Sequence, residues 1–263
     1  SLWNAAGCEV TLLIRRDRVL STWERRASMT LTRELKRRGV NVIARTAVDR
    51  VDTGANLGAT VHYRQGDSDE DRTAYGEVVL AAIGRVPNTD ADWFRSSGLK
   101  LDERGYVTVD GYGRTNLDGV WALGDITPGH ALAHRAFEQG ITIAEKIAGA
   151  DPKPVIDDTV PQVVFSFPEA ASVGLTLDQA KALEDVVEPK ETAYPMLSNA
   201  RMLMSGEGGS MTVVSGAFAN NPDMQVVLGV HIVSPIASDL IAEAEQLVGN
   251  RVPLADAARL IHP

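Results

Sequence analysis

A strand, a tight turn and a helix in direct succession over residues 120–140 constrain this chain more than any other stretch. The sequence there is VWALGDITPGHALAHRAFEQG. We expect a short buried strand ending at Gly124 and Asp125, a Pro/Gly turn, and a helix beginning near Ala131. A carboxylate beside a glycine, between a strand end and a helix N-terminus, is where an α/β fold binds a polar ligand. The stretch predicts a ligand site, although Gly-Asp is also a common turn sequence without a ligand.

The composition is that of a globular protein large enough for one large domain or two ordinary ones. The chain has 263 residues, of which 44% are hydrophobic, and a net charge of −9. Because its Lys and Arg residues are scattered, we expect neither nucleic acid nor a membrane as a partner. Apolar runs of the roughly 18–20 residues that span a bilayer are missing, as is a signal peptide, which predicts a cytoplasmic protein.

Cysteine usage excludes two kinds of site. The single cysteine, Cys8, cannot form an internal disulfide framework or a cysteine-based metal cluster, and no metal site is predicted. Because Cys8 comes just before an apolar strand, we expect a buried, inert thiol.

A β-α-β pattern fills the first part of the chain. Residues 10–14 are a compact β-branched run, typical of a buried parallel strand. Residues 22–38 predict an amphipathic helix that ends at Gly39, and residues 40–44 predict the next strand.

Arg15 and Arg16 directly follow the first of these strands. In a dinucleotide-binding βαβ unit, an acidic residue at the end of the second strand binds a free ribose 2′-OH, whereas Arg accommodates a 2′-phosphate. The pair therefore predicts a contact to the ribose of the cofactor, and a solvated basic turn is the alternative interpretation. The glycine-rich phosphate loop that should precede this strand is not in the sequence.

The central part mixes hairpins with one long helix. We expect β-structure over residues 48–63 with a turn at 54–56, and a polar hairpin tip at 66–70. Further on we expect a buried strand over 77–83 that ends at Gly84, a short helix near Trp93, strands over 106–109 and 120–123, and a helix to about Ala148. Residues on one face of that helix are apolar: Ala133, Ala136, Phe137, Ile141, Ala144 and Ile147.

From about residue 157 the pattern predicts an antiparallel sheet with helices on one face. Strands are expected over 162–167, 210–218 and 225–233, the last two as a hairpin, and helices over 177–183, 238–248 and 254–260. Thr176 is the expected N-cap of the first of these helices.

Four motifs resemble the flavoprotein disulfide reductases, in family order and over nearly the whole chain. They are VVLAAIGRVPN (78–88), VWALGDIT (120–127), ALAHRAFEQGITIAEKIAG (131–149) and VVFSFPEAASVGLT (163–176). Within that family, the AHxAxExG pattern, Asn199-Ala200-Arg201 and LGVHIVSPIASDLIAE (228–243) are most similar to the dihydrolipoamide dehydrogenases.

The resemblance implies a homodimeric FAD-dependent oxidoreductase that transfers electrons between a nicotinamide cofactor, NAD or NADP, and a dithiol or disulfide. It implies an α/β and α+β fold with three parts: a nicotinamide-dinucleotide-binding domain over 1–85, an FAD or central region over 86–156, and a dimerisation domain over 157–263. A lipoyl-bearing complex is the implied larger partner. The parent protein would be the enzyme, and activity of this part alone is left open.

The resemblance also implies roles for single residues. Asp125 would bind a ribityl hydroxyl of FAD, and Gly124 would allow the close approach. Amides near the pyrimidine end of the flavin would come from Leu132, Ala133 and His134, where the helix dipole favours an anionic reduced flavin. For the His134 side chain, capping or packing is an equal alternative to chemistry.

Gly84 and Arg85 would flank the nicotinamide domain, and Arg85 is equally interpretable as a structural ion-pair partner. An FAD-binding N-terminal segment with its CxxxxC motif would lie upstream of Ser1, and we expect both ends of the chain to be cut from a longer protein. Because dihydrolipoamide dehydrogenases usually carry Glu where this chain has Arg15-Arg16, an NADPH-dependent quinone or disulfide reductase is an alternative. A dimerisation module without chemistry is a third hypothesis.

The family's proton-transferring base is a His before Pro, which His262 and Pro263 match. The spacing from the preceding helix better suits the first His of an HxHP pattern, so we assign no catalytic residue.

Overall fold

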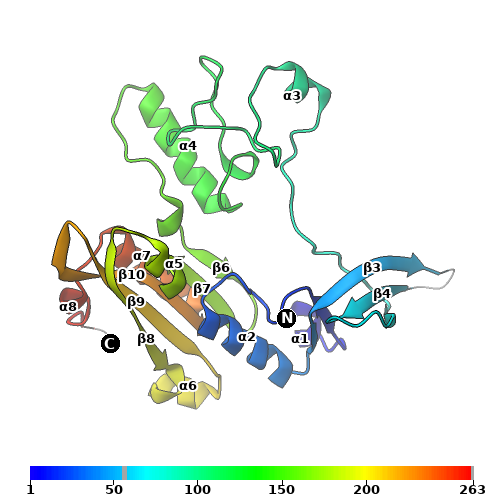
Figure 1. Ribbon diagram of the computed structural model, residues 1–263. Helices are drawn as coiled ribbons and strands as arrows, with labels where there is room; N and C mark the ends of the chain where they lie inside the picture. Colours follow the sequence, from blue (N-terminus) through cyan, green and yellow to red (C-terminus); the bar gives the residue numbers. More distant parts are fainter. Residues whose placement is uncertain (55–57, 262–263) are drawn as a thin grey trace. The chain divides into compact units, whose positions relative to one another are not determined.

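The structure is a computed structural model that describes residues 1–54 and 58–261. It divides into two compact units, which are described separately: Ser1–Ala81 together with Pro161–Pro263, and Ala82–Val160. Parallel and antiparallel sheets both occur, which confirms the expected α/β and α+β class. Figure 1 shows the elements in chain order.

The first unit begins with the predicted β-α-β pattern. The short helix α1 (Leu2–Ala5) precedes strand β1 (Thr11–Ile14), which pairs in parallel with β2 (Asn41–Ala44). Between them lies helix α2 (Arg25–Arg37), whose N-cap Glu24 accepts hydrogen bonds from the amides of Arg26 and Ala27 at 2.6 and 2.7 Å. Such a carboxylate cap stabilises the helix start.

A three-stranded antiparallel meander follows, in the order β3 (Thr46–Thr53), β4 (Ala59–Gln65) and β5 (Arg72–Gly76). The expected β-structure and the hairpin tip at 66–70 are confirmed. Of the turn predicted at 54–56, residues 55 and 56 lie outside the described residues.

Two predictions for this part are wrong. Residues 77–83 form no strand and are exposed, and the Ile83 side chain is 95% accessible. A buried strand needs hydrogen-bonded neighbours, and no described strand pairs with this run. Cys8 is exposed rather than buried, because it lies in the turn after α1 and before β1 begins.

The sheet of the C-terminal part is antiparallel throughout, as predicted, with the strand order β6-β7-β10-β9-β8. Its strands are β6 (Gln162–Val164), β7 (Glu169–Gly174), β8 (Val186–Pro195), β9 (Ser210–Phe218) and β10 (Asn221–Ser234). The hairpin of β9 and β10 is confirmed, whereas β7 and β8 were not predicted. Strand β6 ends three residues earlier than the predicted strand.

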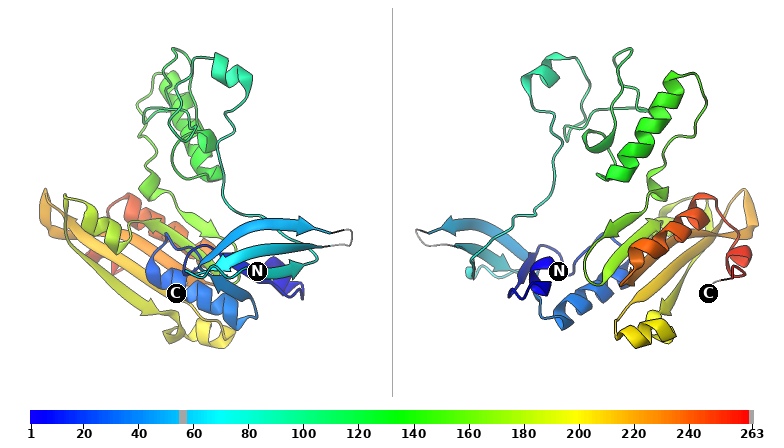
Figure 2. Two further views of the ribbon diagram at one scale, coloured as in Figure 1. Left: turned by 45° about the vertical axis from the view of Figure 1, so that its right-hand side comes forward. Right: turned by 180° about the vertical axis from the view of Figure 1, so that it is seen from behind.

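Helices cover both faces of this sheet, so the prediction of one covered face is wrong. Helix α7 (Ala237–Gly249) packs on the face that carries Ala171 and Ile232. Helix α2 packs on the opposite face, which carries Ala170 and Val233, and Figures 1 and 2 show the two helices on either side. The reason is that successive residues of a strand point to opposite faces, and β7 and β10 are apolar on both.

The remaining helices of this unit are short. Helix α5 (Leu177–Ala182) begins at the predicted N-cap Thr176, with a reciprocal capping box formed by Gln179. The others are η3 (Met196–Ser198), α6 (Ala200–Ser205) and α8 (Leu254–Ala257).

The second unit holds helix α3 (Asp92–Ser96), the 3-10 turns η1 (Gly124–Ile126) and η2 (Asp157–Thr159), and the long helix α4 (Ala133–Ile147). The strands predicted over 106–109 and 120–123 are wrong: each is reduced to one isolated bridge. In this region backbone amides donate to aspartate side chains instead of to a neighbouring strand. Asp102 accepts from the amides of Arg104 and Tyr106, and Asp110 accepts from two further amides.

Candidate functional site

The turn at Gly124 is held in place from both sides. Its amide donates to Oε1 of Gln139 on α4 at 2.9 Å. Its carbonyl accepts from the amide and the hydroxyl of the buried Thr127, at 3.0 and 2.8 Å. The turn and the helix that follows it are therefore one hydrogen-bonded assembly.

Glycine is needed at this position for two reasons. The φ angle of Gly124 is +71°, and a Cβ added there would lie 3.2 Å from the Cβ of Ala136. Only glycine adopts such a backbone without strain. The backbone and the neighbouring helix thus explain the glycine, without the close approach of a ligand that the sequence suggested.

Two of the predicted site residues lie together. Nη1 of Arg85 is 3.6 Å from Oδ2 of Asp125, and both side chains are largely exposed. At this distance the pair is an ion pair without a direct hydrogen bond, so both Asp125 oxygens can still accept one. The adjacent Gly84 has a φ of +133°, and an added Cβ there would meet no atom within 4 Å.

The turn that carries this carboxylate lies against the first residues of α4, since a Cβ on Gly124 would be 3.2 Å from that of Ala136, and no side chain caps the helix. Its N-cap position is Leu132, and Ala133 and His134 form the first turn. First-turn amides have no acceptor within their own helix, and a helix of 15 residues carries a partial positive charge there. Such amides suit an anionic or carbonyl-rich group in general, and their contact with the pyrimidine end of a flavin stays a prediction.

Arg135 fastens the start of α4, and sequence reasoning missed it. Only 5% of its side chain is exposed. Nε donates to Asp157 at 2.5 Å and Nη2 donates to the carbonyl of Pro128 at 2.6 Å. An arginine inside an amphipathic helix is normally solvated, and Glu138 lies three residues further along as an ordinary surface partner, so no sequence signal marks Arg135 as buried.

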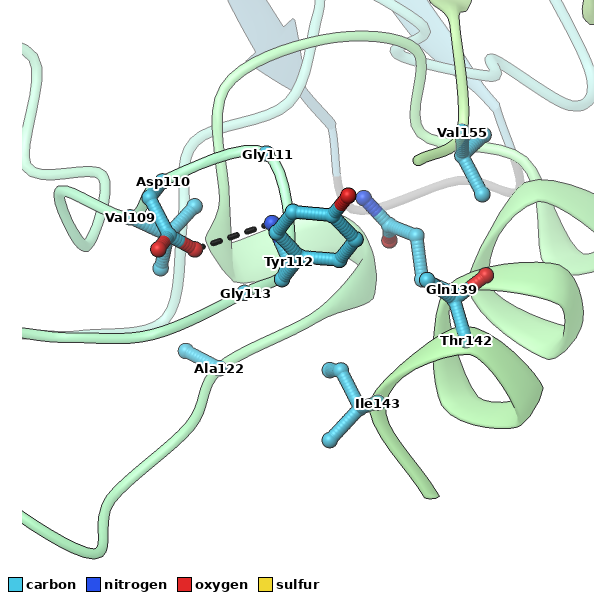
Figure 3. Close-up of a pocket in the computed structure, with 10 residues that line it drawn as sticks. All are labelled: Val109, Asp110, Gly111, Tyr112, Gly113, Ala122, Gln139, Thr142, Ile143 and Val155. Atoms are coloured by element: carbon cyan, nitrogen blue, oxygen red, sulfur yellow. Dashed lines mark hydrogen bonds between the residues drawn. The ribbon is translucent and has the colours of Figure 1, made fainter. Parts of the chain in front are cut away.

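Apolar residues cover the outside of α4. Phe137 is 75% exposed and Ile141 is 53% exposed, and Ile147 belongs to the same face. The buried residues are instead Arg135, Thr142 and Ile143. A cavity of about 20 Å³ lies against this inner face (Figure 3), between the turn at Tyr112 and Gln139, Thr142 and Ile143. It is large enough for about one water molecule and too small for a cofactor.

Arg15 and Arg16 lie in the other unit, in the loop after β1, and both are exposed. Neither side chain has a hydrogen bond or ion pair with a described residue. The neighbouring Asp17 is bound by Arg18 at 2.7 Å, which lowers the pKa of Asp17. The loop carboxylate is thus paired with Arg18, and the ribose contact predicted for Arg15 and Arg16 stays a prediction.

One buried titratable group belongs to the sheet. His231 on β10 is almost fully buried, and burial lowers its pKa. Nε2 lies 3.2 Å from the carbonyl of Leu175, and Nδ1 lies 2.7 Å from the hydroxyl of Ser172. Since a carbonyl only accepts, Nε2 carries the proton and Nδ1 accepts from the serine.

Metal-ligand geometry is missing from the described residues, which hold no group of three or more His, Cys, Asp or Glu side chains able to bind an ion. None of the helices in the described ranges is both long and apolar enough to cross a bilayer. His262 lies outside the described residues.

Comparison with known families gives two matches that together cover most of the chain. Residues 1–140 match the pyridine nucleotide-disulphide oxidoreductase family, and residues 160–263 match the dimerisation domain of the same family.

Individual relatives agree with this result. Dihydrolipoyl dehydrogenase of Cupriavidus necator is 36% identical over 100% of this chain and 54% of its own length. The enzyme of the same name from Geobacillus stearothermophilus is 35% identical over 97% and 52%. The crystal structure of LpdA from Mycobacterium tuberculosis superimposes with a TM-score of 0.85 at 29% identity, covering 99% of this chain and 54% of that one. The chain thus spans about half the length of the relatives it matches.

Proposed function

Because the chain belongs to the pyridine nucleotide-disulphide oxidoreductase family, we propose that it is part of a flavoenzyme similar to dihydrolipoamide dehydrogenase. The proposed reaction moves electrons between a nicotinamide cofactor and a dithiol or disulfide. Residues 1–85 would serve the nicotinamide dinucleotide, residues 86–156 the flavin, and residues 157–263 dimer formation. A cytoplasmic location remains a prediction.

One observation carries the flavin assignment: an exposed carboxylate lies beside a helix start that no side chain caps. Asp125 would accept a hydrogen bond from a ribityl hydroxyl. In the first turn of α4, the amides of Ala133 and His134 would donate to the pyrimidine oxygens, whereas the predicted Leu132 amide already donates to the carbonyl of His130 at 3.0 Å. When bound, FAD supplies the two-electron step between nicotinamide and dithiol. The helix N-terminus would stabilise negative charge on the flavin by about 0.3–1 kcal/mol, and more where water is excluded.

Arg85 has a supporting role in this proposal. At 3.6 Å its guanidinium lies near Asp125 without using the acceptor oxygens of that carboxylate in a direct hydrogen bond. The exposure of both side chains means that the pair can separate at little cost when a ligand arrives.

The test is FAD affinity in the full-length protein that contains this chain. Asp125→Asn keeps the shape and removes the charge, and we expect an FAD dissociation constant raised about tenfold or more, since a hydrogen bond to a charged group is worth about 1.5–3 kcal/mol. Asp118→Asn, an exposed aspartate of the same unit, is the matched control and should bind FAD normally. Equal affinities for both variants would contradict the assignment.

A second candidate function rests on Arg15 and Arg16, whose side chains have no partner among the described residues. Free arginines after β1 favour a 2′-phosphate, hence NADPH, and with it a quinone or disulfide reductase. Hydride transfer from NADH and from NADPH, compared before and after Arg15→Glu, decides between the two. If Arg15 contacts the phosphate, the variant should lose about 1.5–3 kcal/mol of NADPH binding and keep NADH binding.

The proposed partners are a second copy of the chain and a lipoyl-bearing complex. The match of residues 160–263 to a dimerisation domain supports the homodimer. Sedimentation of the chain with and without FAD tests it. A dimer that takes up no FAD in the full-length protein would favour the third hypothesis, a dimerisation module without chemistry.

A further inference from the structure

We propose that Arg45 is a third member of the anion site formed with Arg15 and Arg16, and that the site binds the 2′-phosphate of an adenosine dinucleotide. Arg45 lies 29 residues further along the chain than Arg16 and belongs to no motif in the sequence. The inference deepens the proposed function and rests on its dinucleotide-binding part alone.

Strand register brings the three residues to one edge. β1 and β2 are parallel, and Ile14 is the register partner of Ala44. The next residues, Arg15 and Arg45, therefore leave the sheet at the same carboxyl edge, where α/β folds bind their ligands. Neighbouring strands are about 4.8 Å apart, so the two backbones lie within reach of one phosphate group.

A hydrogen bond holds Arg45 in this place. Its amide donates to the carbonyl of Arg16 at 2.9 Å, and its own carbonyl accepts from the amide of Gly66 at 2.8 Å. Its φ is +56°, in the left-handed region that non-glycine residues rarely adopt. A glycine or asparagine would meet that backbone demand more easily, so the arginine side chain is not there for the turn.

The three arginines also lack carboxylate partners. Like Arg15 and Arg16, Arg45 is exposed, and its side chain has no hydrogen bond or ion pair with a described residue. By contrast, Arg50, Arg64 and Arg72 of the adjoining meander each pair with a carboxylate. Three exposed arginines without a carboxylate partner at one strand edge form a locally positive site on a chain with a net charge of −9, and such a site attracts anions.

A phosphate monoester dianion suits this donor set. Each guanidinium offers planar, paired N–H donors that match phosphate oxygens. Because the arginines follow two adjacent strands, β1 and β2, they can contact one phosphate group from two sides. Arg15 and Arg16 alone, in a single turn, could contact it from one side only.

Calorimetric titration of the full chain with adenosine 2′,5′-bisphosphate, adenosine 5′-monophosphate and inorganic phosphate tests the proposal. Arg45→Gly removes the cation and suits the left-handed backbone, so folding should be preserved. We expect it to weaken bisphosphate binding about tenfold and to change 5′-monophosphate binding less than twofold. Arg45→Lys should lose only part of the affinity. Arg259→Gly, an exposed arginine of the C-terminal part, is the matched control and should bind as the unchanged chain does.

Two results would contradict the proposal. If Arg45→Gly binds the bisphosphate as the unchanged chain does, Arg45 is not part of the site, while the assignment of Arg15 survives. If the unchanged chain binds the bisphosphate no better than 5′-monophosphate or inorganic phosphate at millimolar concentration, the 2′-phosphate site is refuted. Neither result depends on FAD binding or dithiol chemistry, which the Asp125 variants test separately.

Discussion

The C-terminal sheet and the unit Ala82–Val160 use apolar residues in opposite ways. In the sheet, Ile232 is 1% exposed and lies in a core shared with α7. On α4, Ile141 is 53% exposed although its helix shows a regular apolar face. The sheet is thus stabilised by its own side chains, whereas much of the second unit is held by polar contacts such as that of Arg135.

The difference teaches that an amphipathic pattern identifies a helix but not its partner. The chain spans about half the length of its relatives, and the face of α4 around Phe137 and Ile141 has no cover among the described residues. A helix forms through hydrogen bonds within its own backbone, whereas its apolar face is buried only when another surface of matching shape packs against it.

Replacing Ile232 tests the contrast with the largest expected effect. Ile232→Ala should lower the free energy of unfolding by about 2–5 kcal/mol, because it removes buried methyl groups and leaves a cavity. Ile141→Ala is the matched control and should cost less than about 1 kcal/mol, since its side chain is half exposed. Urea titration followed by circular dichroism measures both. Comparable losses would mean that α4 is covered in solution, for example by a second copy.

Arg135 tests whether polar contacts hold the second unit. Arg135→Met should destabilise the start of α4 by about 2–3 kcal/mol, somewhat below the range for fully buried pairs because Asp157 is 38% exposed. The control, Lys146→Met, breaks the pair with the exposed Asp151 and should leave the protection of α4 nearly unchanged, because solvent screens an exposed ion pair. Amide hydrogen exchange along α4 reports both. Unchanged protection in Arg135→Met would show that the apolar contacts of Ile143 suffice.

Local patterns could be predicted from the sequence, whereas strand pairing could be predicted only for the hairpin of β9 and β10, where a turn joins the two strands. Strand β9 was placed at its observed bounds, because alternation and a turn signal mark it on both sides. Strand β7 was missed: its sequence EAASVG has weak strand propensity, and its structure comes from pairing with β6 and β10. Its small alanines are instead what lets α2 and α7 approach both faces.

The candidate sites show the same limit. Asp125 and Arg85 were singled out separately, and only the fold shows them to be an ion pair. Arg45 carried no signal, because its role depends on the register of β1 and β2. Strands predicted around Gly124 failed since short carboxylate-capped turns satisfy the same backbone groups.

Substitution of Gly124 tests how firmly the turn before α4 packs on that helix. Gly124→Ala should cost about 1–2 kcal/mol for the left-handed backbone, plus the contact with Ala136. Gly119→Ala is the control: its φ of +73° is nearly the same, and an added Cβ meets nothing within 4 Å. The excess cost in Gly124→Ala, measured by thermal unfolding, reports packing on α4. No excess would show that α4 shifts freely and is not fastened to the turn.

The smallest expected effect is the pH dependence of stability that the buried His231 gives to the C-terminal sheet. Since burial lowers its pKa in the folded state, the unfolded chain, with a pKa near 6.5, binds the proton more readily. The stability that neutral His231 provides is complete above pH 6.5, and it falls as the pH drops below that value. Between pH 7 and 5.5 the stability should fall by at most about 1 kcal/mol, since one group cannot give a slope above about 1.4 kcal/mol per pH unit.

His231→Gln removes this titration while retaining a group that can donate to the carbonyl of Leu175. Its stability should therefore fall less than that of the unchanged chain over the same pH range, in urea titrations at each pH. Carboxylates elsewhere titrate equally in both proteins, so they cancel in the difference. A constant gap between the two proteins from pH 7 to 5.5 would mean that the sheet opens enough for water to reach the imidazole. The sheet would then be no better sealed than the exposed face of α4, and the contrast between the two units would rest on Ile232 alone.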